Sequence, residues 1–328
     1  MTKQSIIVNG NGSDLGNSKG FKGRAKRKMI TQKTILNLVD VMDKYGADER
    51  KKSYWNTYHC LNKVYTANGK LYGKYCKNRF CTLCCSIRKA QIINSYLPVI
   101  QTWEEPYFVT LTIKAIKAER LKILISKILE GFQIIKDRYR KRNSRGTDIK
   151  LIGIKSLECN FNPAMKTYNP HLHLIVANKR NADILKREWL MLWKDNWAYK
   201  GAQKISKVGS TEKALIEIVK YGSKIFTEPD VRKKTETKDQ SKIYVAALDN
   251  IFTAMKGVRI FERFGFDLPK DAQPNQSKAT VIKEYYEWVY DANYFDWLNT
   301  ENELTLSGYD PEAKLLDLLE NRIDTLLR

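Results

Sequence analysis

The sequence predicts a domain of the α+β class, in which helices pack against an antiparallel sheet. Three short runs rich in β-branched and aromatic residues predict strands at residues 107–113, 151–159 and 171–177. Only eleven residues, 160–170, join the last two runs, and so short a connection favours antiparallel pairing. The chain has 328 residues, 43% of them apolar, which is enough to bury a substantial core.

The first hundred residues predict two segments of different composition. Residues 1–32 are rich in Gly, Asn and Ser and run into the basic GRAKRK, which predicts a flexible basic arm. Residues 33–100 predict a zinc-binding cysteine segment that opens with a short helix at 33–44. The arm and a basic loop at 138–145 are candidates for phosphate contacts, with ordinary solvated charge as the alternative.

Residues 101–265 predict the principal domain. A long amphipathic helix at 116–140 follows the first strand, and a Trp-rich helix at 185–197 follows the third. Further on, the pattern predicts a short strand at 204–208, a helix from Thr211, a polar loop at 228–242 and a helix at 244–256. Residues 266–328 predict a linker and an acidic helical tail.

The distribution of charge limits the class of partner. The formal net charge is +22, yet residues 281–328 contain eleven acidic and four basic residues, so the positive excess lies upstream. Such an excess favours a polyanion such as nucleic acid. Because no stretch approaches the ~20 uninterrupted apolar residues of a spanning helix, and no apolar signal core begins the chain, we expect a cytoplasmic protein without a membrane partner.

Two of the three histidines in the chain lie two positions apart in a predicted strand. His171 and His173 should therefore project from the same face of the sheet. Glu158, near the end of the preceding strand, is the natural third metal ligand. Similar ligand sets hold iron or zinc, but phosphodiester chemistry in a basic protein favours Mg²⁺ or Mn²⁺. Surface histidines and a solvated carboxylate are the alternative.

The segment EIVKYGSK predicts a helical face that carries Glu217, Tyr221 and Lys224. A phenol is a poor nucleophile at its free pKa of ~10, so it needs an electrophile that a metal ion has activated. Lys224, together with Lys220, can neutralise neighbouring phosphates. Since a tyrosine in a helix is more often a packing residue, this candidate depends on the metal site beside it.

Four cysteines have the spacing C-x15-C-x4-C-x2-C, namely Cys60, Cys76, Cys81 and Cys84. This spacing is adequate for a closed tetrahedral zinc site with thiolate ligands, which would fix a loop-rich segment. His59 or Cys85 could replace one ligand. Reduced structural cysteines without a metal ion are the alternative.

Three blocks, FVTLTIK, NPHLHLIVA and EIVKYGSK, occur in an order and spacing that resemble a known family. The family is the single-tyrosine rolling-circle initiators (Rep) of plasmids, within the HUH superfamily of endonucleases. The cysteine block CKNRFCTLCCSIRKA is similar to the block that precedes these motifs in the family. It departs from the family at Thr82, where Pro is usual, and at the doubled Cys84 and Cys85. The resemblance covers about residues 60–225.

The resemblance implies a metal-dependent, site-specific single-strand DNA endonuclease and strand transferase. Tyr221 would attack the origin phosphodiester and leave a 5′-phosphotyrosine with a free 3′-hydroxyl, and Glu217 would activate water for termination. The implied fold has a central antiparallel sheet that carries the metal ligands, with helices on one face and the Tyr221 helix over the other. The implied partners are single-stranded or hairpin origin DNA, a host helicase and a host polymerase.

Two other functions remain open on the sequence alone. A single-strand transposase would use the same nicking chemistry to move DNA. A zinc-stabilised DNA-binding regulator without catalysis would explain the charge and the cysteines, but not the paired histidines or the Glu217 and Tyr221 helix. The regulator predicts DNA binding without cleavage.

Overall fold

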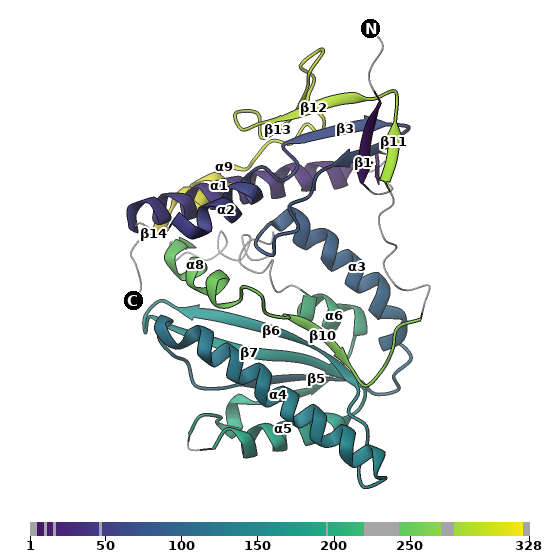
Figure 1. Ribbon diagram of the computed structural model, residues 1–328, viewed down its shortest axis with the longest axis vertical. Coiled ribbons are helices and arrows are strands. Elements are labelled where there is room, and N and C mark those ends of the chain that lie inside the picture. The colour runs from purple at the N-terminus through teal and green to yellow at the C-terminus, as the bar shows by residue number, and fades with distance from the viewer. Residues whose placement is uncertain are drawn as a thin grey trace. The chain divides into compact units, whose positions relative to one another are not determined.

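The computed structural model describes residues 5–9, 12–15, 18–45, 48–194, 196–219, 243–269 and 279–323. The chain forms two compact units (Figure 1). The first contains residues 1–88, 222–245 and 274–324, and the second contains residues 89–221, 246–273 and 325–328. Each unit has its own sheet and core. In the part of the chain that the structure describes, no helix is both long enough and apolar enough to cross a membrane.

The helices of the first unit begin earlier than the sequence predicts. α1 spans Ser18–Tyr45, and η1 (Asp48–Arg50) and α2 (Lys51–Tyr58) follow it. The flexible basic arm predicted for residues 1–32 is therefore wrong from residue 18 onward. Phe21, Ala25 and Met29 recur at four-residue spacing and are buried, so the basic run lies within an amphipathic helix.

Lys28, the last residue of that basic run, is fully buried. Its Nζ donates hydrogen bonds of 2.7 Å each to the carbonyl oxygens of Tyr58 and Cys60 and to Oδ1 of Asn62. Burial lowers the pKa of Lys28 to about 8. Lys28 is thus a structural residue that satisfies buried acceptors, and it is not available for a phosphate group.

The first unit contains a five-stranded antiparallel sheet of order β13-β12-β3-β4-β2. Its strands are β2 (Ser13–Asp14), β3 (Lys63–Ala67), β4 (Lys70–Gly73), β12 (Tyr286–Asp291) and β13 (Asp296–Asn299). β1 (Ile6–Asn9) pairs antiparallel with β11 (Ala279–Ile282), and β9 (Ile243–Tyr244) pairs in parallel with β14 (Arg322–Ile323).

The prediction of an acidic helical tail within residues 266–328 is wrong for most of the residues that the structure describes there. Residues 279–299 contribute three strands, and only α9 (Ala313–Glu320) is an α-helix there. Trp288 Nε1 donates to Thr66 Oγ1 at 2.9 Å, and the buried Trp297 donates through Nε1 to the Leu61 carbonyl at 2.6 Å. The tail forms strands because it pairs with β3, more than two hundred residues earlier in the chain.

The second unit contains a five-stranded antiparallel sheet of order β10-β6-β7-β5-β8. Its strands are β5 (Tyr107–Thr112), β6 (Gly153–Asn162), β7 (Thr167–Val176), β8 (Lys204–Lys207) and β10 (Phe261–Phe264). β6 and β7 form the antiparallel pair that their short connection predicts. The α+β class and its antiparallel sheet are confirmed.

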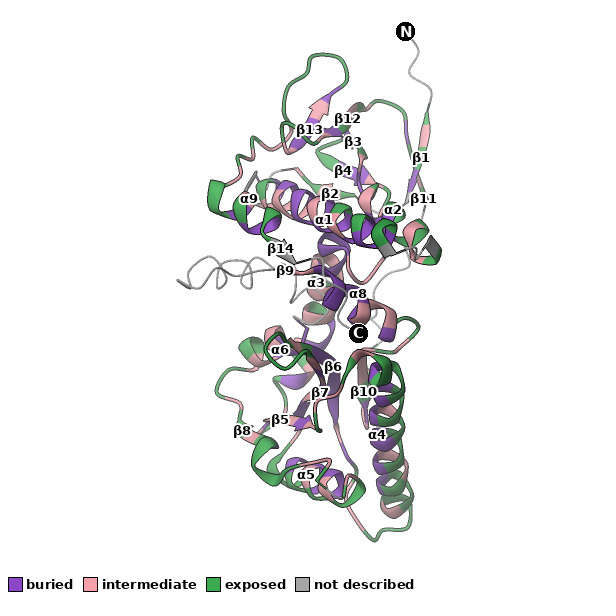
Figure 2. Cartoon of the chain, turned by 90° about the vertical axis from the view of Figure 1, so that its left-hand side faces the viewer, coloured by how far each residue is buried: buried purple, intermediate pink, exposed green. Residues whose placement is uncertain are grey.

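Helices cover both faces of this sheet (Figure 1). One face packs against α4 (Leu121–Ser144) and α5 (Lys179–Leu192). The other packs against α6 (Thr211–Val219) and the second half of α3 (Thr82–Ile100), through a cluster in which Ile154 and Ile175 of the sheet contact Leu215 and Ile218. Buried residues concentrate in the central strands and along one side of α4 (Figure 2).

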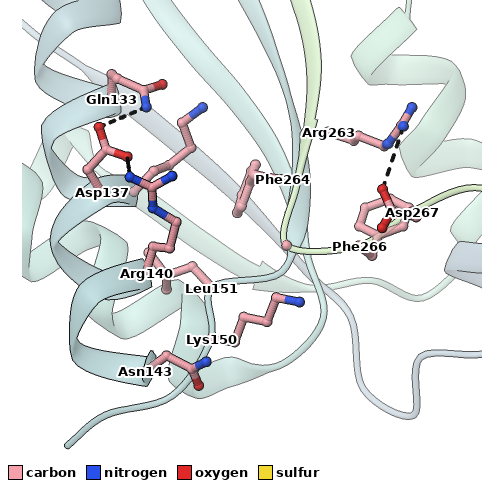
Figure 3. A pocket seen from close by; sticks show the side chains of 12 residues that line it. Gln133, Asp137, Arg140, Asn143, Lys150, Leu151, Arg263, Phe264, Phe266 and Asp267 are labelled. Carbon is pink, nitrogen blue, oxygen red and sulfur yellow. Dashed lines mark hydrogen bonds and ion pairs between the residues drawn. The ribbon is translucent and has the colours of Figure 1, made fainter. Parts of the chain in front are cut away.

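Two further segments of the second unit bear on the predictions. The basic loop predicted at 138–145 is helical up to Ser144, so these residues form the last turns of α4 (Figure 3). α8 (Val245–Ala254) matches the helix predicted at 244–256, and its Asn250 donates through Nδ2 to the Tyr168 hydroxyl at 2.8 Å. The polar loop predicted at 228–242 lies outside the described residues.

Candidate functional site

Three potential metal ligands meet on the sheet face that α6 covers. The register of β6 and β7 sets Glu158 directly opposite His171, and Ser156 opposite His173. Because alternate residues of a strand share a face, all three ligands project to the side that carries Ile154 and Ile175. Those two residues contact α6, so the ligands and α6 lie on the same side of the sheet.

The ligand atoms are close enough to share one ion. Glu158 Oε2 lies 3.6 Å from His171 Nε2 and 3.4 Å from His173 Nε2, and the two Nε2 atoms are 3.2 Å apart. Ligands about 2.1 Å from a common cation are separated by roughly 3.0–3.5 Å. Two imidazole nitrogens and a carboxylate oxygen at these separations fit a divalent cation. Glu158 is fully buried, and His173 keeps the largest exposed fraction of the three side chains, 14%.

Hydrogen bonds behind the imidazoles fix which nitrogen faces the ligand group. His171 Nδ1 lies 2.9 Å from the Asn169 carbonyl, which can only accept, so Nδ1 donates and Nε2 keeps its lone pair. His173 Nδ1 lies 3.1 Å from Thr110 Oγ1. Asn169 is held in turn, because its Oδ1 accepts from Thr112 Oγ1 at 3.0 Å. The neighbouring strand β5 therefore orients both histidines.

Thr110 and Thr112 were not among the residues that the sequence singled out. The sequence feature that could have pointed to them is their spacing of two in FVTLTIK, which puts both hydroxyls on one face of a strand. The sequence alone does not show that β5 lies beside β7 with Thr110 opposite His173, so nothing in it connected these threonines with the histidines.

The residues predicted for nucleophilic chemistry are described only in part. Glu217 lies half-buried on α6, which ends at Val219. Tyr221 and Lys224, with Lys220, lie outside the described residues.

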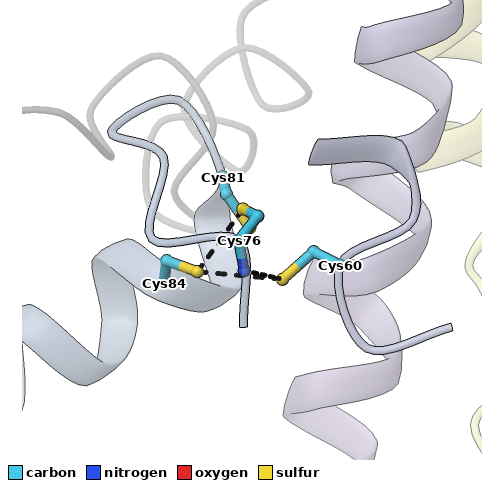
Figure 4. A group of neighbouring side chains, drawn as sticks. All are labelled: Cys60, Cys76, Cys81 and Cys84. Atoms are coloured by element: carbon cyan, nitrogen blue, oxygen red, sulfur yellow. Dashed lines mark hydrogen bonds between the residues drawn. The ribbon is translucent and has the colours of Figure 1, made fainter. Parts of the chain in front are cut away.

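The four predicted zinc ligands form a second cluster, in the first unit (Figure 4). Their Sγ atoms all lie within 4.8 Å of one another. Cys84 Sγ is 3.7 Å from Cys60 Sγ and 3.6 Å from Cys76 Sγ, too far for a disulfide. Thiolates about 2.3 Å from a tetrahedral zinc ion are separated by roughly 3.8 Å, so the cluster fits this ion.

Backbone amides also point at these sulfur atoms. The amide of Lys77 lies 3.2 Å from Cys84 Sγ, and that of Asn78 lies 3.4 Å from Cys76 Sγ. The amide of Cys76 lies 3.4 Å from Cys60 Sγ. Hydrogen bonds of this kind favour the thiolate form, which is the form that ligates metal ions.

The two alternative zinc ligands lie outside this cluster. Cys85 Sγ donates to the Arg79 carbonyl at 2.8 Å, and burial raises the pKa of this thiol to about 12. His59 Nδ1 lies 3.3 Å from Asn62 Nδ2, and its ring stacks on Trp55. Neither belongs to the group of side chains that could hold a common ion.

The chain matches the Rep_1 family, described as Replication protein, over residues 69–289. This stretch is more than half of the sequence and contains both candidate sites except Cys60. The chain belongs to this family of replication proteins, which confirms the resemblance seen in the sequence motifs.

Curated relatives carry the name Protein rep. The protein from Bacillus amyloliquefaciens is 30% identical over 222 residues, 58% of this chain and 63% of the relative. The protein from a Bacillus species is 28% identical over 58% of this chain and 69% of the relative. The protein from Staphylococcus aureus is 31% identical over 49% of this chain and 72% of the relative. No solved structure matches the chain.

Proposed function

We propose that this replication protein initiates rolling-circle replication by nicking single-stranded origin DNA, with Tyr221 as the nucleophile. The observation that carries the proposal is the convergence of Glu158, His171 and His173 on the sheet face that α6 covers. α6 ends at Val219, two residues before Tyr221 in the sequence. Membership of a replication protein family supports a role in DNA replication.

The reaction is a transesterification. Tyr221 Oη attacks the phosphorus and loses its proton, the bond from phosphorus to the 3′ oxygen breaks, and that oxygen takes up a proton. The products are a 5′-phosphotyrosine and a free 3′-hydroxyl. One phosphodiester replaces another, so no water is consumed until termination, and a host polymerase can extend the 3′-hydroxyl behind a host helicase.

Glu158, His171 and His173 would hold Mg²⁺ or Mn²⁺, which when bound supplies a Lewis acid for a phosphate oxygen. The protein's own contribution is to orient these side chains, and Thr110 and Asn169 support this role through Nδ1 of each histidine. Lys224 and Lys220 would neutralise phosphates that flank the nick.

Glu217 would act in termination. A carboxylate on α6, four residues before Tyr221 in the sequence, can accept a proton from the water that releases the DNA. Cys60, Cys76, Cys81 and Cys84 would hold a structural Zn²⁺ that supports the fold of the first unit.

The other functions explain less. A non-catalytic regulator needs no carboxylate buried beside two histidines whose Nε2 atoms face it. A transposase would share the chemistry, but the family match favours replication.

The test begins with a library of labelled hairpin DNAs, because the origin sequence must first be found. Wild-type protein and Mn²⁺ should trap a subset of strands covalently, and sequencing them identifies the substrate. On that substrate, His173→Ala should reduce nicking to the level seen in EDTA, while Trp55→Ala, at an exposed ring of the first unit, should not. Undiminished nicking by His173→Ala in EDTA would contradict a metal site at these residues.

A further inference from the structure

The end of strand β5 lies beside the candidate metal ligands. Thr112, the last residue of β5, is directly opposite His171 on β7. On its other side β5 pairs with β8, but this pairing ends at Thr110, opposite Lys204. The backbone N–H and C=O of Thr112 therefore need partners that the β8 strand does not provide, because a buried backbone group without a partner is costly.

The side chain of Gln203 supplies these partners. Its Oε1 accepts from the Thr112 amide at 2.8 Å, and its Nε2 donates to the Thr112 carbonyl at 3.1 Å. A carboxamide carries an acceptor and a donor, so it can take the place of a peptide group in a paired strand. Nε2 also donates to the Tyr199 carbonyl at 2.9 Å. The Gln203 residue is only 3% exposed, so these hydrogen bonds are sheltered from water.

Helix α5 lies beside β5 and β8 and fixes this arrangement (Figure 2). Lys186 Nζ donates to the Gln203 carbonyl at 2.8 Å. The fully buried Trp189 donates through Nε1 to the Thr112 carbonyl at 3.1 Å. Gln203 and Thr112 are thus both held by side chains of the same helix.

From Thr112 the hydrogen bonds continue to His171. Thr112 Oγ1 donates to Asn169 Oδ1 at 3.0 Å, and Asn169 Nδ2 donates to the Ile113 carbonyl at 3.0 Å. Both ends of the Asn169 amide are therefore attached to the end of β5. The backbone carbonyl of Asn169 accepts from His171 Nδ1 at 2.9 Å. A displacement of Thr112 would move the group that orients this imidazole.

We propose that Gln203 is a positioning residue for the candidate metal site. It holds Thr112, and through Thr112 and Asn169 it keeps Nε2 of His171 directed at Glu158. The effect on metal binding rests on the proposed function, whereas the orientation of the imidazole does not require a metal ion. Loss of a group that orients a ligand usually weakens metal binding about 10–100-fold, and Gln203 acts through other residues, so the lower end applies.

The first test is Mn²⁺ binding by the full chain without DNA. Gln203→Met keeps the length of the side chain but loses its hydrogen bonds, and Thr112→Val keeps the branched shape but loses the hydroxyl. Each should weaken Mn²⁺ binding about tenfold. Gln133→Met is the control, because this glutamine is exposed on α4 and bonds to Asp137. Equal Mn²⁺ affinity in wild type and Gln203→Met would overturn the proposal.

The double variant shows whether Gln203 acts through Thr112. If it does, Gln203→Met combined with Thr112→Val should bind Mn²⁺ within about twofold of Thr112→Val alone. Independent effects would multiply to about 100-fold, and that result would contradict the proposed route to His171.

The second test needs no metal ion. Since the chain contains only three histidines, selective ¹⁵N labelling of histidine gives a simple spectrum, and His171→Gln identifies the signal of His171. The Nδ1 proton of His171 should exchange with solvent about tenfold faster in Gln203→Met and in Thr112→Val than in wild type, because the acceptor is no longer held. Unchanged exchange in Gln203→Met would overturn the proposal.

Thermal unfolding separates positioning from general stability. Both single variants should unfold cooperatively, at temperatures well above that of the measurements. If Gln203→Met does not fold, Gln203 serves stability and its proposed role is wrong, while Thr112→Val still tests the link from Thr112 to His171. If the wild type binds no Mn²⁺, the proposed metal site fails, and the exchange of the His171 proton still decides whether Gln203 positions the imidazole.

Discussion

The hydroxyl of Thr110 lies behind His173, 3.1 Å from Nδ1, and a small change of side chain removes this contact cleanly. Thr110→Val keeps the side-chain shape but loses the hydroxyl. We expect affinity for Mn²⁺ to fall about 10–100-fold, the usual effect of losing a group that orients a ligand. Thr110→Ser should restore it.

Mn²⁺ binding by the purified protein, followed by electron paramagnetic resonance or calorimetry, measures this effect without any DNA. Thr102→Val is the control, because its hydroxyl bonds only to the Val99 carbonyl on an exposed surface. Equal Mn²⁺ affinity in wild type and Thr110→Val would show that the contact does not orient His173.

Cys81 and Cys85, four residues apart in the sequence, give a matched pair for the second site. Cys81 belongs to the group of four thiols, whereas Cys84's neighbour Cys85 bonds to the Arg79 carbonyl. Purified protein should contain about one zinc ion per chain. Cys81→Ser should lose most of this zinc and unfold at a lower temperature, while Cys85→Ser should retain it, because only one thiol of the pair is a ligand. Elemental analysis that finds equal zinc in the two variants would contradict the assignment.

Lys28 shows where sequence reasoning fails for a single residue. A lysine in a basic, glycine-rich run is normally solvated, and its burial is visible only once the Tyr58 and Cys60 carbonyls come to lie against it. The metal ligands were easier to predict, because a spacing of two in a strand is enough to bring His171 and His173 to one face.

Helix α6 carries the prediction for termination. Glu217 should assist the water that ends the cycle, but it should not be needed for the first nick, because a carboxylate does not replace the phenol. Glu217→Ala should therefore form the Tyr221 adduct at a normal rate and release product about 10²–10⁴-fold more slowly. Glu212→Ala, an exposed carboxylate on the first turn of α6, is the control.

The measurement is the rate of the second cleavage on DNA already attached to Tyr221. Release at the wild-type rate by Glu217→Ala would mean that another group activates the water.

Elements with a strong local pattern were predicted well, and elements that depend on distant partners were not. β5, β6 and β7 have alternating or β-rich sequences, and their observed bounds lie within a few residues of the predicted ones. β12 also carries alternating aromatic residues, but its partner β3 lies far away in the sequence, so its acidic residues suggested a solvated helix instead. Local sequence patterns also could not predict the order of the strands in each sheet.

Across the whole chain, each unit contains one of the candidate metal sites. The cysteine group lies in a unit built from both ends of the sequence, and the Glu158, His171 and His173 group lies in the unit formed by the middle. On the proposed function, zinc would support the fold of one unit and a divalent cation would support chemistry in the other. The family match spans residues of both units.

The central claim is that Tyr221 forms a covalent bond with DNA at this site. The most direct test is mass spectrometry of the protein after reaction with its trapped hairpin substrate, Mn²⁺ and a nuclease that trims the attached strand. The account predicts a nucleotide adduct on the peptide that contains Tyr221, absent in Tyr221→Phe and present in Tyr199→Phe, which removes the hydroxyl of an exposed tyrosine in the second unit. An adduct at wild-type yield in Tyr221→Phe, or one found on a different residue of the wild type, would contradict it.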